Sequence, residues 1–480
     1  MSAEPVTEAT NTVLITVDSL RADAVEHDPE SEVTPVLGEL SSRSTSTVFE
    51  NAFAHGNWTP FSFPSILASR SVFSDSRNIG APETPTLAEA LSRESVSTGG
   101  FNASNGFLTH HWEYDRGFDE FEDFIESNDR IYSKYLMAHP TVQGWIQLGT
   151  SPFKRLASAV KREGDDTHFA DTSRMIELEE RAKGFIRERS DGSFFIWIHY
   201  MDTHTPYVPA PRHVREVSSS HMGTLGMLRA HLYTGLGWDV DEKILSRLRT
   251  LYEATVRQVD ESIGRLLSLL SDEGIRDETC VVVAGDHGEE FQEHGHLAHY
   301  PKLYNELINV PLIVDLPRDG LEADSVSEPV GLNSVPPTVC DVMGVETPED
   351  WEGESLLRDG PDDEPVVSVT VRGDSVTQQP IPKTPDEGDL LVSARTSDWT
   401  YIKNTETGEK ELYNTAEDDF KKNDLYSESN TEFGDTEIIE SFRRRVHERA
   451  EEVLSNESHE EEDDGMSDEV SKRLEALGYR

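Results

Sequence analysis

Three apolar segments of this chain each run directly into side chains that bear a carboxylate or an imidazole. The segments are residues 281–285, 13–17 and 194–198, and they are followed by Asp286-His287, by Asp18, and by His199, Asp202 and His204. Continuous apolar runs are typical of buried parallel strands, which deliver the residues that follow them to one edge of a sheet. The sequence therefore predicts one polar site at the carboxyl edge of an α/β sheet.

The pair Asp286-His287 is the strongest part of this pattern. A carboxylate beside an imidazole suits Zn²⁺ or Mn²⁺, and a carboxylate-rich shell also accepts Ca²⁺ or Mg²⁺. A salt-bridged surface turn is the structural alternative, but the nearby His294, His296 and His299 favour a metal site. Asp18, taken alone, is equally well explained as a helix N-cap, where Asp satisfies free backbone amides.

Short apolar runs alternate with helical patterns over residues 12–355, which predicts an α/β domain with a mainly parallel sheet. The expected strands are Val13–Val17, Val96–Phe101, Phe194–His199, Thr279–Ala284 and Pro311–Leu316, and the expected helices are Thr172–Arg189 and Ile244–Leu270. Residues 125–170 and 208–243 lack clear periodicity and are interpreted as cap insertions. Short antiparallel strands predict a small C-terminal α+β subdomain over residues 356–450, and residues 451–480 are expected to form an acidic tail.

Composition limits the partners and the compartment. The formal net charge is −49, from 92 acidic and 43 basic residues, so we expect no nucleic-acid partner because phosphates are repelled. We interpret this charge as an adaptation to a high-salt interior, where self-repulsion is screened. Cys280 and Cys340 lie in apolar runs and are expected to be core residues. No signal-peptide pattern and no membrane-spanning stretch is present, so a cytoplasmic location is expected.

Two further segments carry groups that nucleophilic or acid–base chemistry uses. Residues 58–66 contain Thr59, Ser62 and two prolines, and a hydroxyl becomes a good nucleophile when a metal or a base lowers its pKa. The structural alternative is a Pro/Ser turn that caps a helix beginning near Pro64. His204 precedes an extended Thr-Pro turn, which can aim the imidazole into a cleft as acid, base or anion donor. An ordinary loop histidine is the alternative.

Taken in order, these motifs resemble the sulfatase family of the alkaline phosphatase superfamily over about residues 12–430. The opening metal motif resembles residues 18–23, the Thr-Pro-x-Leu helix resembles residues 34–37, and the nucleophile motif resembles residues 62–65. The His-x-Pro-Tyr motif matches residues 204–207, and the second metal motif matches residues 285–289. Three later segments of the family are also resembled, by residues 304–306 with 310–314, by Pro337-Thr338 with Gly344, and by Trp399–Ile402 with Glu411–Tyr413.

The resemblance implies a three-layer α/β/α sandwich with one divalent cation, Ca²⁺, Mn²⁺ or Zn²⁺, held by Asp18, Asp286 and His287. It implies Ser62 as both nucleophile and metal ligand. His204 would protonate the leaving group or hold the anion. His299 falls where many members place a lysine that grips the anion. Arg21, Lys302 and Asn105 are the candidate substrate-binding residues.

The chain also departs from the family pattern. Ser19 replaces the second early aspartate, and Ile66 replaces the arginine of the signature that guides oxidation of Cys or Ser to formylglycine. Formylglycine at Ser62 is therefore disfavoured, and Thr59 is the alternative nucleophile.

These features together predict a haloarchaeal-type, metal-dependent hydrolase that cleaves sulfate esters, with a small anionic ester or a sulfated glycan as substrate. With an unmodified Ser62, the same site would serve a phosphodiester or phosphonate monoester hydrolase, or a phosphoryl transferase. A non-catalytic binder of anionic glycans is the third hypothesis. Ser19 and Ile66 favour it, and the intact Asp-His pair and His204 oppose it.

Overall fold

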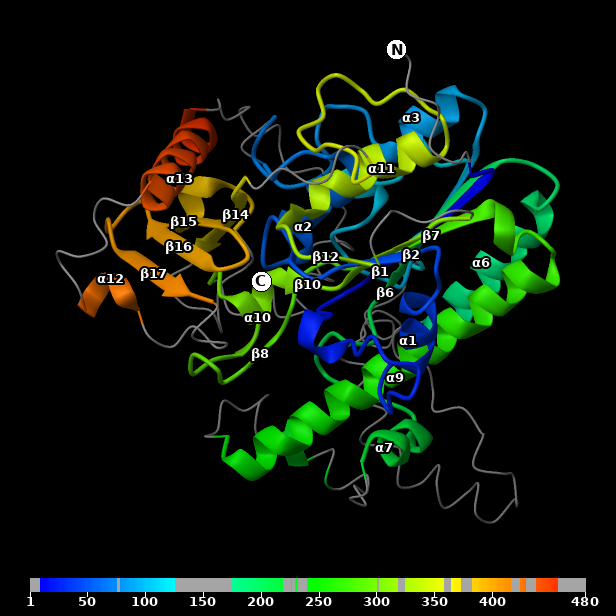
Figure 1. Ribbon diagram of the computed structural model, residues 1–480, viewed down its shortest axis with the longest axis horizontal. Helices are drawn as coiled ribbons and strands as arrows, with labels where there is room; N and C mark the ends of the chain where they lie inside the picture. The colour runs from blue at the N-terminus through cyan, green and yellow to red at the C-terminus, as the bar shows by residue number, and fades with distance from the viewer. Residues whose placement is uncertain are drawn as a thin grey trace, which may run out of the picture.

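The computed structural model describes residues 9–75, 78–125, 174–218, 226, 229–231, 240–299, 302–317, 324–357, 364–372, 382–415, 424–428 and 437–455. Its centre is an eight-stranded sheet with the strand order β12-β2-β11-β7-β1-β6-β4-β5 (Figure 1). These strands are β1 (Asn11–Val17), β2 (Ser46–Phe49), β4 (Ser97–Asn102), β5 (Glu120–Glu122), β6 (Phe194–Tyr200), β7 (Thr279–Gly285), β11 (Leu312–Asp315) and β12 (Ser325–Val326).

Helices cover both faces of this sheet. One face carries α1 (Pro35–Ser41), α6 (Met175–Arg189), α7 (Pro211–Val217) and α9 (Glu242–Asp272), and the other carries α2 (Thr59–Ala68), α3 (Leu87–Arg93) and α11 (Val335–Val342) (Figure 1). Side chains alternate across a strand, so Val13 and Ile15 of β1 enter the core beneath α9, whereas Leu14 enters the core beneath α2 and α11. The predicted three-layer α/β/α fold is confirmed.

The expected central strands are all present, with boundaries shifted by one or two residues. The sheet is mixed at one side, because β11 pairs with both β7 and β2 in the antiparallel direction. The helix expected near Pro64 instead begins at Thr59. Pro60 does not prevent this earlier start, because a proline in the first turn lacks only an N–H that would have no helical partner.

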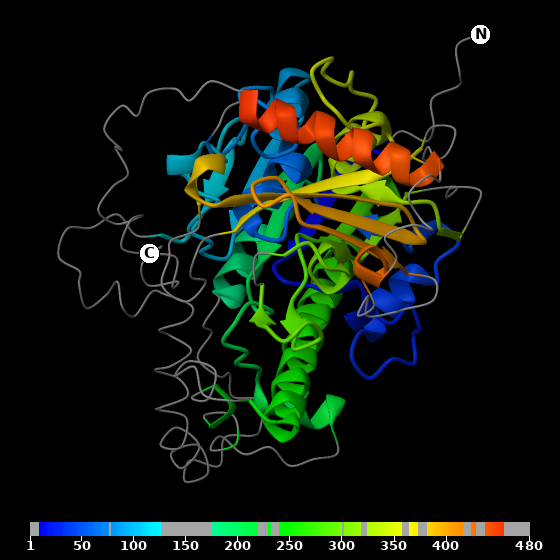
Figure 2. The same ribbon diagram turned by 90° about the vertical axis from the view of Figure 1, so that its left-hand side faces the viewer.

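A second, four-stranded antiparallel sheet follows in the C-terminal part. It contains β14 (Val366–Arg372), β15 (Asp389–Arg395), β16 (Trp399–Asn404) and β17 (Lys410–Asn414), in that order. Helix α13 (Glu437–Ser455) packs on one face, and α10 (Asn305–Ile308) packs on the other (Figure 2). The prediction of a tail from residue 451 is wrong at its start, because residues 451–455 complete α13 and Val453 is buried.

The remaining elements are short. They are β3 (Ala52–Phe53), β8 (Glu290–Phe291), β9 (Leu297–Ala298), β10 (Asn309–Val310), β13 (Val330–Gly331) and α12 (Leu425–Glu428), with 3₁₀ turns at Ala22–Ala24, His110–Trp112, Arg276–Glu278, Leu332–Ser334 and Pro385–Glu387. Nearly all of the first predicted cap insertion, part of the second, and residues 456–480 lie outside the described residues.

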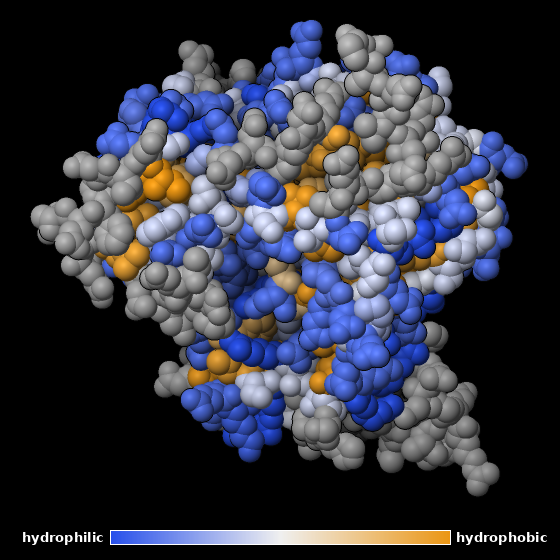
Figure 3. Space-filling model, viewed as in Figure 1, coloured by the Kyte–Doolittle hydropathy of each residue, from blue (hydrophilic) through white to orange (hydrophobic). Residues whose placement is uncertain are grey.

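The described surface is mainly polar. Hydrophilic side chains make up much of the face in Figure 3, and Ile176 and Leu454 are the exposed large hydrophobic side chains among the described residues. Within that part of the chain, no helix is both long enough and apolar enough to cross a membrane. Cys280 and Cys340 are free and buried, as predicted.

Candidate active site

The register of the central sheet brings the two aspartates of the predicted site together. Val17 of β1 lies opposite Gly285 of β7 in adjacent parallel strands, so the next residues, Asp18 and Asp286, leave the sheet side by side. The Asp18 amide donates to the Tyr200 carbonyl at 2.9 Å, and the Asp286 amide donates to the Val17 carbonyl at 3.2 Å. Both aspartates are completely buried. The carboxyl edge of the sheet therefore presents a carboxylate pair, which is the juxtaposition that the sequence predicts.

The hydroxyl group that lies between these carboxylates belongs to Thr59. Its Oγ1 lies 3.2 Å from Asp18 Oδ2 and 3.0 Å from Asp286 Oδ2. Ser62 lies almost one turn further along α2, where its buried Oγ donates to the backbone carbonyl of Asp286 at 2.6 Å. Because α2 begins at Thr59, its first position, and not that of Ser62, meets the carboxylate pair. The geometry does not support the expected role of Ser62 as metal ligand and nucleophile.

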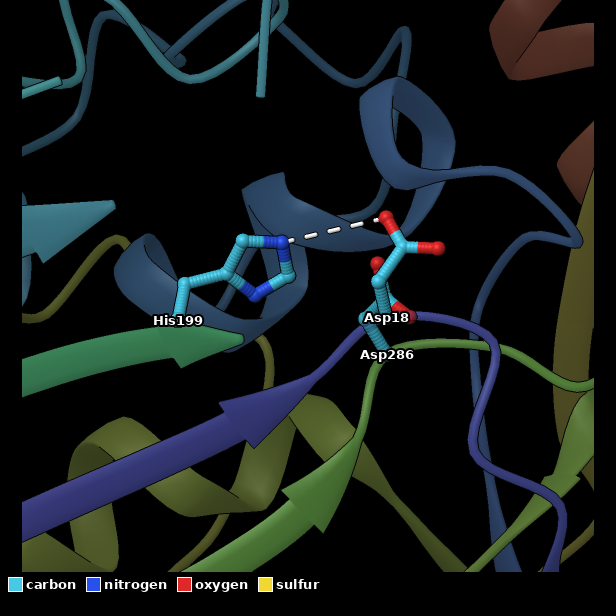
Figure 4. Close-up of side chains that lie close together, drawn as sticks. All are labelled: Asp18, His199 and Asp286. Atoms are coloured by element: carbon cyan, nitrogen blue, oxygen red, sulfur yellow. Dashed lines mark ion pairs between the residues drawn. The ribbon is translucent and has the colours of Figure 1, made fainter. Parts of the chain in front are cut away.

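Two imidazoles face the same carboxylates. Nε2 of His287 lies 3.9 Å from Asp18 Oδ1 and 3.8 Å from Asp286 Oδ2. Its Nδ1 donates to the Gly288 carbonyl at 2.9 Å, which leaves Nε2 as the ring nitrogen that faces the carboxylates and is in position to bind a metal. Nε2 of His199 lies 3.8 Å from Asp18 Oδ2 and has no hydrogen-bond partner among the described residues (Figure 4).

This set of donors fits a divalent cation. One donor atom each from Asp18, His199 and Asp286 lies within 4.8 Å of the other two, close to the separation of about 3–4 Å expected for ligands around Zn²⁺. Burial, reinforced by the Asp18 carboxylate, raises the pKa of Asp286. Burial also opposes ionisation of Asp18, but the neighbouring histidines outweigh it and hold the pKa of Asp18 well below its usual range. Two buried carboxylates that share one hydroxyl proton call for a compensating positive charge.

A second group of side chains borders the carboxylate pair. The ring of His299 lies 5.1 Å, centre to centre, from the rings of both His204 and His287. Nδ1 of His204 donates to the Thr205 carbonyl at 2.7 Å, and burial lowers the pKa of His204. Glu289 is completely buried, and its Oε2 lies 3.5 Å from His299 Nδ1. Glu289 and the imidazoles of His204, His287 and His299 thus form one cluster beside the carboxylate pair.

The predicted substrate-binding residues are separated by the fold. Arg21 donates to Glu293 and to the Glu289 carbonyl, both at 2.8 Å, and also pairs with Asp23. Lys302 pairs with Glu411 at 3.3 Å. Both cations are thus held in structural ion pairs, and the structure does not bring them to the carboxylate pair.

Asn105 does reach the site, and Ser19 supports it. Asn105 Nδ2 lies 3.2 Å from Asp18 Oδ2 and 3.3 Å from Thr59 Oγ1. Ser19 stands where the family has its second aspartate, and it donates from its hydroxyl to Asp18 and from its amide to Asp286. Ser19 adopts a left-handed backbone conformation with φ 55°. Both side chains therefore orient the carboxylates.

The sequence placed His199 at the predicted site without a specific role, and it did not single out Glu289. His199 is visible as the last polar residue of an apolar run, but its direction depends on the pairing of β6 with β1, where it lies opposite Thr16. Glu289 follows the Asp-His-Gly motif directly, and only its burial beside His299 distinguishes it from the other glutamates of that segment.

The fold and the carboxylate–histidine centre define an α/β protein built like the metal-dependent ester hydrolases of the alkaline phosphatase superfamily. The sequence profile of the Sulfatase family matches residues 10–345, which is more than half of the chain. The chain therefore belongs to the sulfatase family.

The similarity to individual curated proteins covers only parts of the chain. The chain is 26% identical to the multifunctional alkaline phosphatase superfamily protein PehA of Trinickia caryophylli over 225 residues, which cover 42% of each protein. It is 41% identical to an N-acetylglucosamine-6-O-sulfatase of Bacteroides thetaiotaomicron over 108 residues, which cover 22% of this chain and 19% of that one. The chain thus spans less than half of the length of these curated relatives.

Solved structures resemble the whole chain. A protein in complex with its substrate D-glucosamine-2-N,6-O-disulfate superimposes with a TM-score of 0.67 at 17% identity, covering 95% of this chain and 100% of that one. The phosphonate monoester hydrolase of Agrobacterium radiobacter superimposes with a TM-score of 0.63 at 16% identity, covering 94% and 95%. At these identities the likeness concerns the fold.

Proposed function

We propose that this protein is a metal-dependent ester hydrolase in which Thr59 is the nucleophile and the substrates are phosphate diesters or phosphonate monoesters. The observation that carries the proposal is the position of Thr59 Oγ1, within 3.2 Å of a carboxylate oxygen of both Asp18 and Asp286. A divalent cation held by Asp18, Asp286, His287 and Thr59 would supply the Lewis acidity that lowers the pKa of the hydroxyl.

In this proposal the Thr59 hydroxyl gives its proton to one of the two carboxylates as its oxygen attacks phosphorus. The bond between phosphorus and the leaving oxygen breaks, and His204 donates a proton to that oxygen. His299, held beside Glu289, would donate a hydrogen bond to a non-bridging oxygen. Water then attacks phosphorus and gives a proton to His204, the bond to Thr59 breaks, and the threonine oxygen recovers its proton from the carboxylate.

The choice of phosphorus over sulfur follows from the chemistry of threonine. Formylglycine is an aldehyde, and it arises from a side chain with a CH₂ group at Cβ. Thr59 carries a methyl group at Cβ, so its oxidation would give a ketone. An aldehyde hydrate has a second hydroxyl that can expel sulfate by breaking the C–O bond. A threonine ester lacks that hydroxyl, so its release requires attack at the central atom, which phosphorus supports more readily than a sulfate sulfur.

Sulfate-ester hydrolysis is the second candidate. The family assignment and the match to the structure holding a disulfated glucosamine favour it, with a sulfated glycan as substrate. It would require Ser62 to turn away from the Asp286 carbonyl and to carry the modification.

Two other roles are distinguishable. A transferase would pass the Thr59-bound group to a sugar or lipid hydroxyl, so a product formed with an alcohol acceptor added to the assay would reveal it. The buried carboxylate pair, whose donor atoms fit a cation, argues against a role limited to glycan binding.

The proposal is tested with the full chain in MnCl₂ and p-nitrophenyl esters of sulfate, phosphate diester and phenylphosphonate. We expect turnover of the phosphorus esters, an unmodified Ser62 by peptide mass spectrometry, and loss of both metal and turnover in Asp286→Ala. The exposed Asp277→Ala is the matched control, because Asp277 lies in the turn before β7, at the opposite end of that strand from Asp286. Retained turnover in metal-free Asp286→Ala, or formylglycine at Ser62 with turnover of the sulfate ester alone, contradicts the proposal.

A further inference from the structure

A second cluster of carboxylates and imidazole lies outside the candidate active site. It joins the β8–β9 hairpin to α10, near β17 (Figure 1). Glu290 begins β8, His294 lies in the hairpin loop, and Glu306 lies in α10. One donor atom from each of these three residues lies within 4.8 Å of the other two. The sequence singled out His294 as part of a histidine cluster, and the active-site geometry leaves it without a catalytic role.

Glu290 presents a buried oxygen without a partner. Its Oε1 accepts hydrogen bonds from the backbone amides of His294 at 3.0 Å and His296 at 2.8 Å. Its Oε2 has no hydrogen-bond partner among the described residues, although the side chain is completely buried. A buried, unsatisfied carboxylate oxygen costs several kcal/mol unless a positive charge compensates it, on the order of the penalty for a buried ion. One oxygen of Glu290 therefore shapes the hairpin loop, and the other is available to a ligand.

The neighbours of Glu290 add negative charge and hold the imidazole in place. Glu306 is 7% exposed, and its Oε1 lies 2.6 Å from His294 Nδ1. The Tyr304 ring stacks on His294 at a centroid distance of 3.7 Å. Burial, together with the Glu306 carboxylate, raises the pKa of Glu290. Two carboxylates thus converge on one imidazole in a rigid setting.

A buried cation, Arg395, interacts electrostatically with Glu306 but forms no direct ion pair with the cluster among the described residues. Arg395 of β15 is completely buried, and its guanidinium donates to the Leu303 carbonyl at 2.7 Å and to the Ser393 hydroxyl at 3.1 Å. Among the described residues, neither Glu290 nor Glu306 forms an ion pair with an arginine or a lysine. A bound cation, or a proton on Glu290 or on the His294 ring that pairs with Glu306, would supply the compensating charge.

We propose that Glu290, His294 and Glu306 form a second divalent-cation site, separate from the one at Asp18 and Asp286. One imidazole with two carboxylates is a donor set that suits Zn²⁺ or Mn²⁺, with water completing the coordination. Such a cation ties α10 to the hairpin that precedes His299, so its structural effect is to fix the segment that carries this active-site residue.

Metal content tests the site without depending on catalysis. The full chain is saturated with ZnCl₂, desalted and measured by inductively coupled plasma mass spectrometry. We expect about two zinc ions in the native chain, and about one in Glu290→Gln and in Asp286→Asn, since each variant removes a charged ligand of one site. The exposed Glu409→Gln makes the same change of charge away from both clusters and should keep the native content. Equal zinc content in native and Glu290→Gln chains overturns the proposal and assigns the compensating charge to a proton.

Crystals of the native chain provide a second measurement that needs no variant. Anomalous difference density at the zinc absorption edge should show one peak among Glu290, His294 and Glu306 in addition to the peak at Asp18 and Asp286. A peak at the aspartate pair alone overturns the second site and leaves the proposed catalytic cation intact.

Discussion

Replacing Thr59 by valine removes the hydroxyl from the carboxylate pair and keeps the shape of the side chain. If Thr59 is the nucleophile, turnover has no covalent route, and loss of a nucleophile costs about 10⁵- to 10⁶-fold in kcat by analogy with other covalent enzymes. At 1.36 kcal/mol for each tenfold, this corresponds to about 7–8 kcal/mol of transition-state stabilisation. Thr59→Ser restores a hydroxyl at the same backbone position and should recover much of the activity.

The matched variant is Ser62→Ala, in the same helix. The Ser62 hydroxyl donates one hydrogen bond, to the Asp286 carbonyl at 2.6 Å, and its removal takes this donor away from a buried acceptor. We therefore expect a loss of about 1–3 kcal/mol in the free energy of unfolding and a kcat within about tenfold of the native value.

The assay is steady-state hydrolysis of p-nitrophenyl phenylphosphonate in MnCl₂, with urea unfolding measured on the same preparations. Acid quenching followed by peptide mass spectrometry then locates the covalent ester. Abolished turnover in Ser62→Ala together with near-native turnover in Thr59→Val would exclude Thr59 as the nucleophile. An ester found on the peptide at Ser62 after Thr59→Val would exclude it equally.

Three further predictions concern stability and salt. Burial raises the pKa of Asp260 to about 6, where its carboxylate accepts the Val36 and Leu37 amides of α1. The folded state therefore holds this proton more tightly than the unfolded state does. The stability that this contributes below about pH 4 is lost as the pH rises through 6. In Asp260→Asn, the free energy of unfolding measured in urea should vary less between pH 4 and 7, by up to about 3 kcal/mol. Chelation by EDTA should lower Tm, since a cation at about 1,000 times its Kd contributes about 4 kcal/mol; an unchanged Tm in metal-depleted protein contradicts a bound cation. With a net charge of −49, activity and Tm should rise with KCl into the molar range, where the Debye length falls to about 3 Å; full activity and an unchanged Tm in dilute buffer argue against the halophilic interpretation.

The elements that the sequence predicted best are those with the longest apolar periodicity. The stripe expected over Ile244–Leu270 is found in α9, and the apolar runs before Asp18 and Asp286 are found in β1 and β7. The antiparallel direction of β11 was not predictable, because the sequence of a four-residue apolar strand is equally compatible with parallel and antiparallel pairing. The neighbouring strands determine which pairing forms. The end of α13 was hidden by its charge, although Val453 packs into the C-terminal core.

The sequence alone was enough to group Asp18 and Asp286 in one predicted site, because residues that follow adjacent parallel strands emerge at the same edge of a sheet. It also determined the family through the order of its motifs. The hydroxyl that meets the carboxylates could be identified only from the folded chain, because the start of α2 at Thr59 depends on how the helix packs and not on its two prolines alone. The same is true of the cations. Arg21 and Lys302 are close to the motifs in sequence, but carboxylates distant in the chain, Glu293 and Glu411, hold them in ion pairs away from the site.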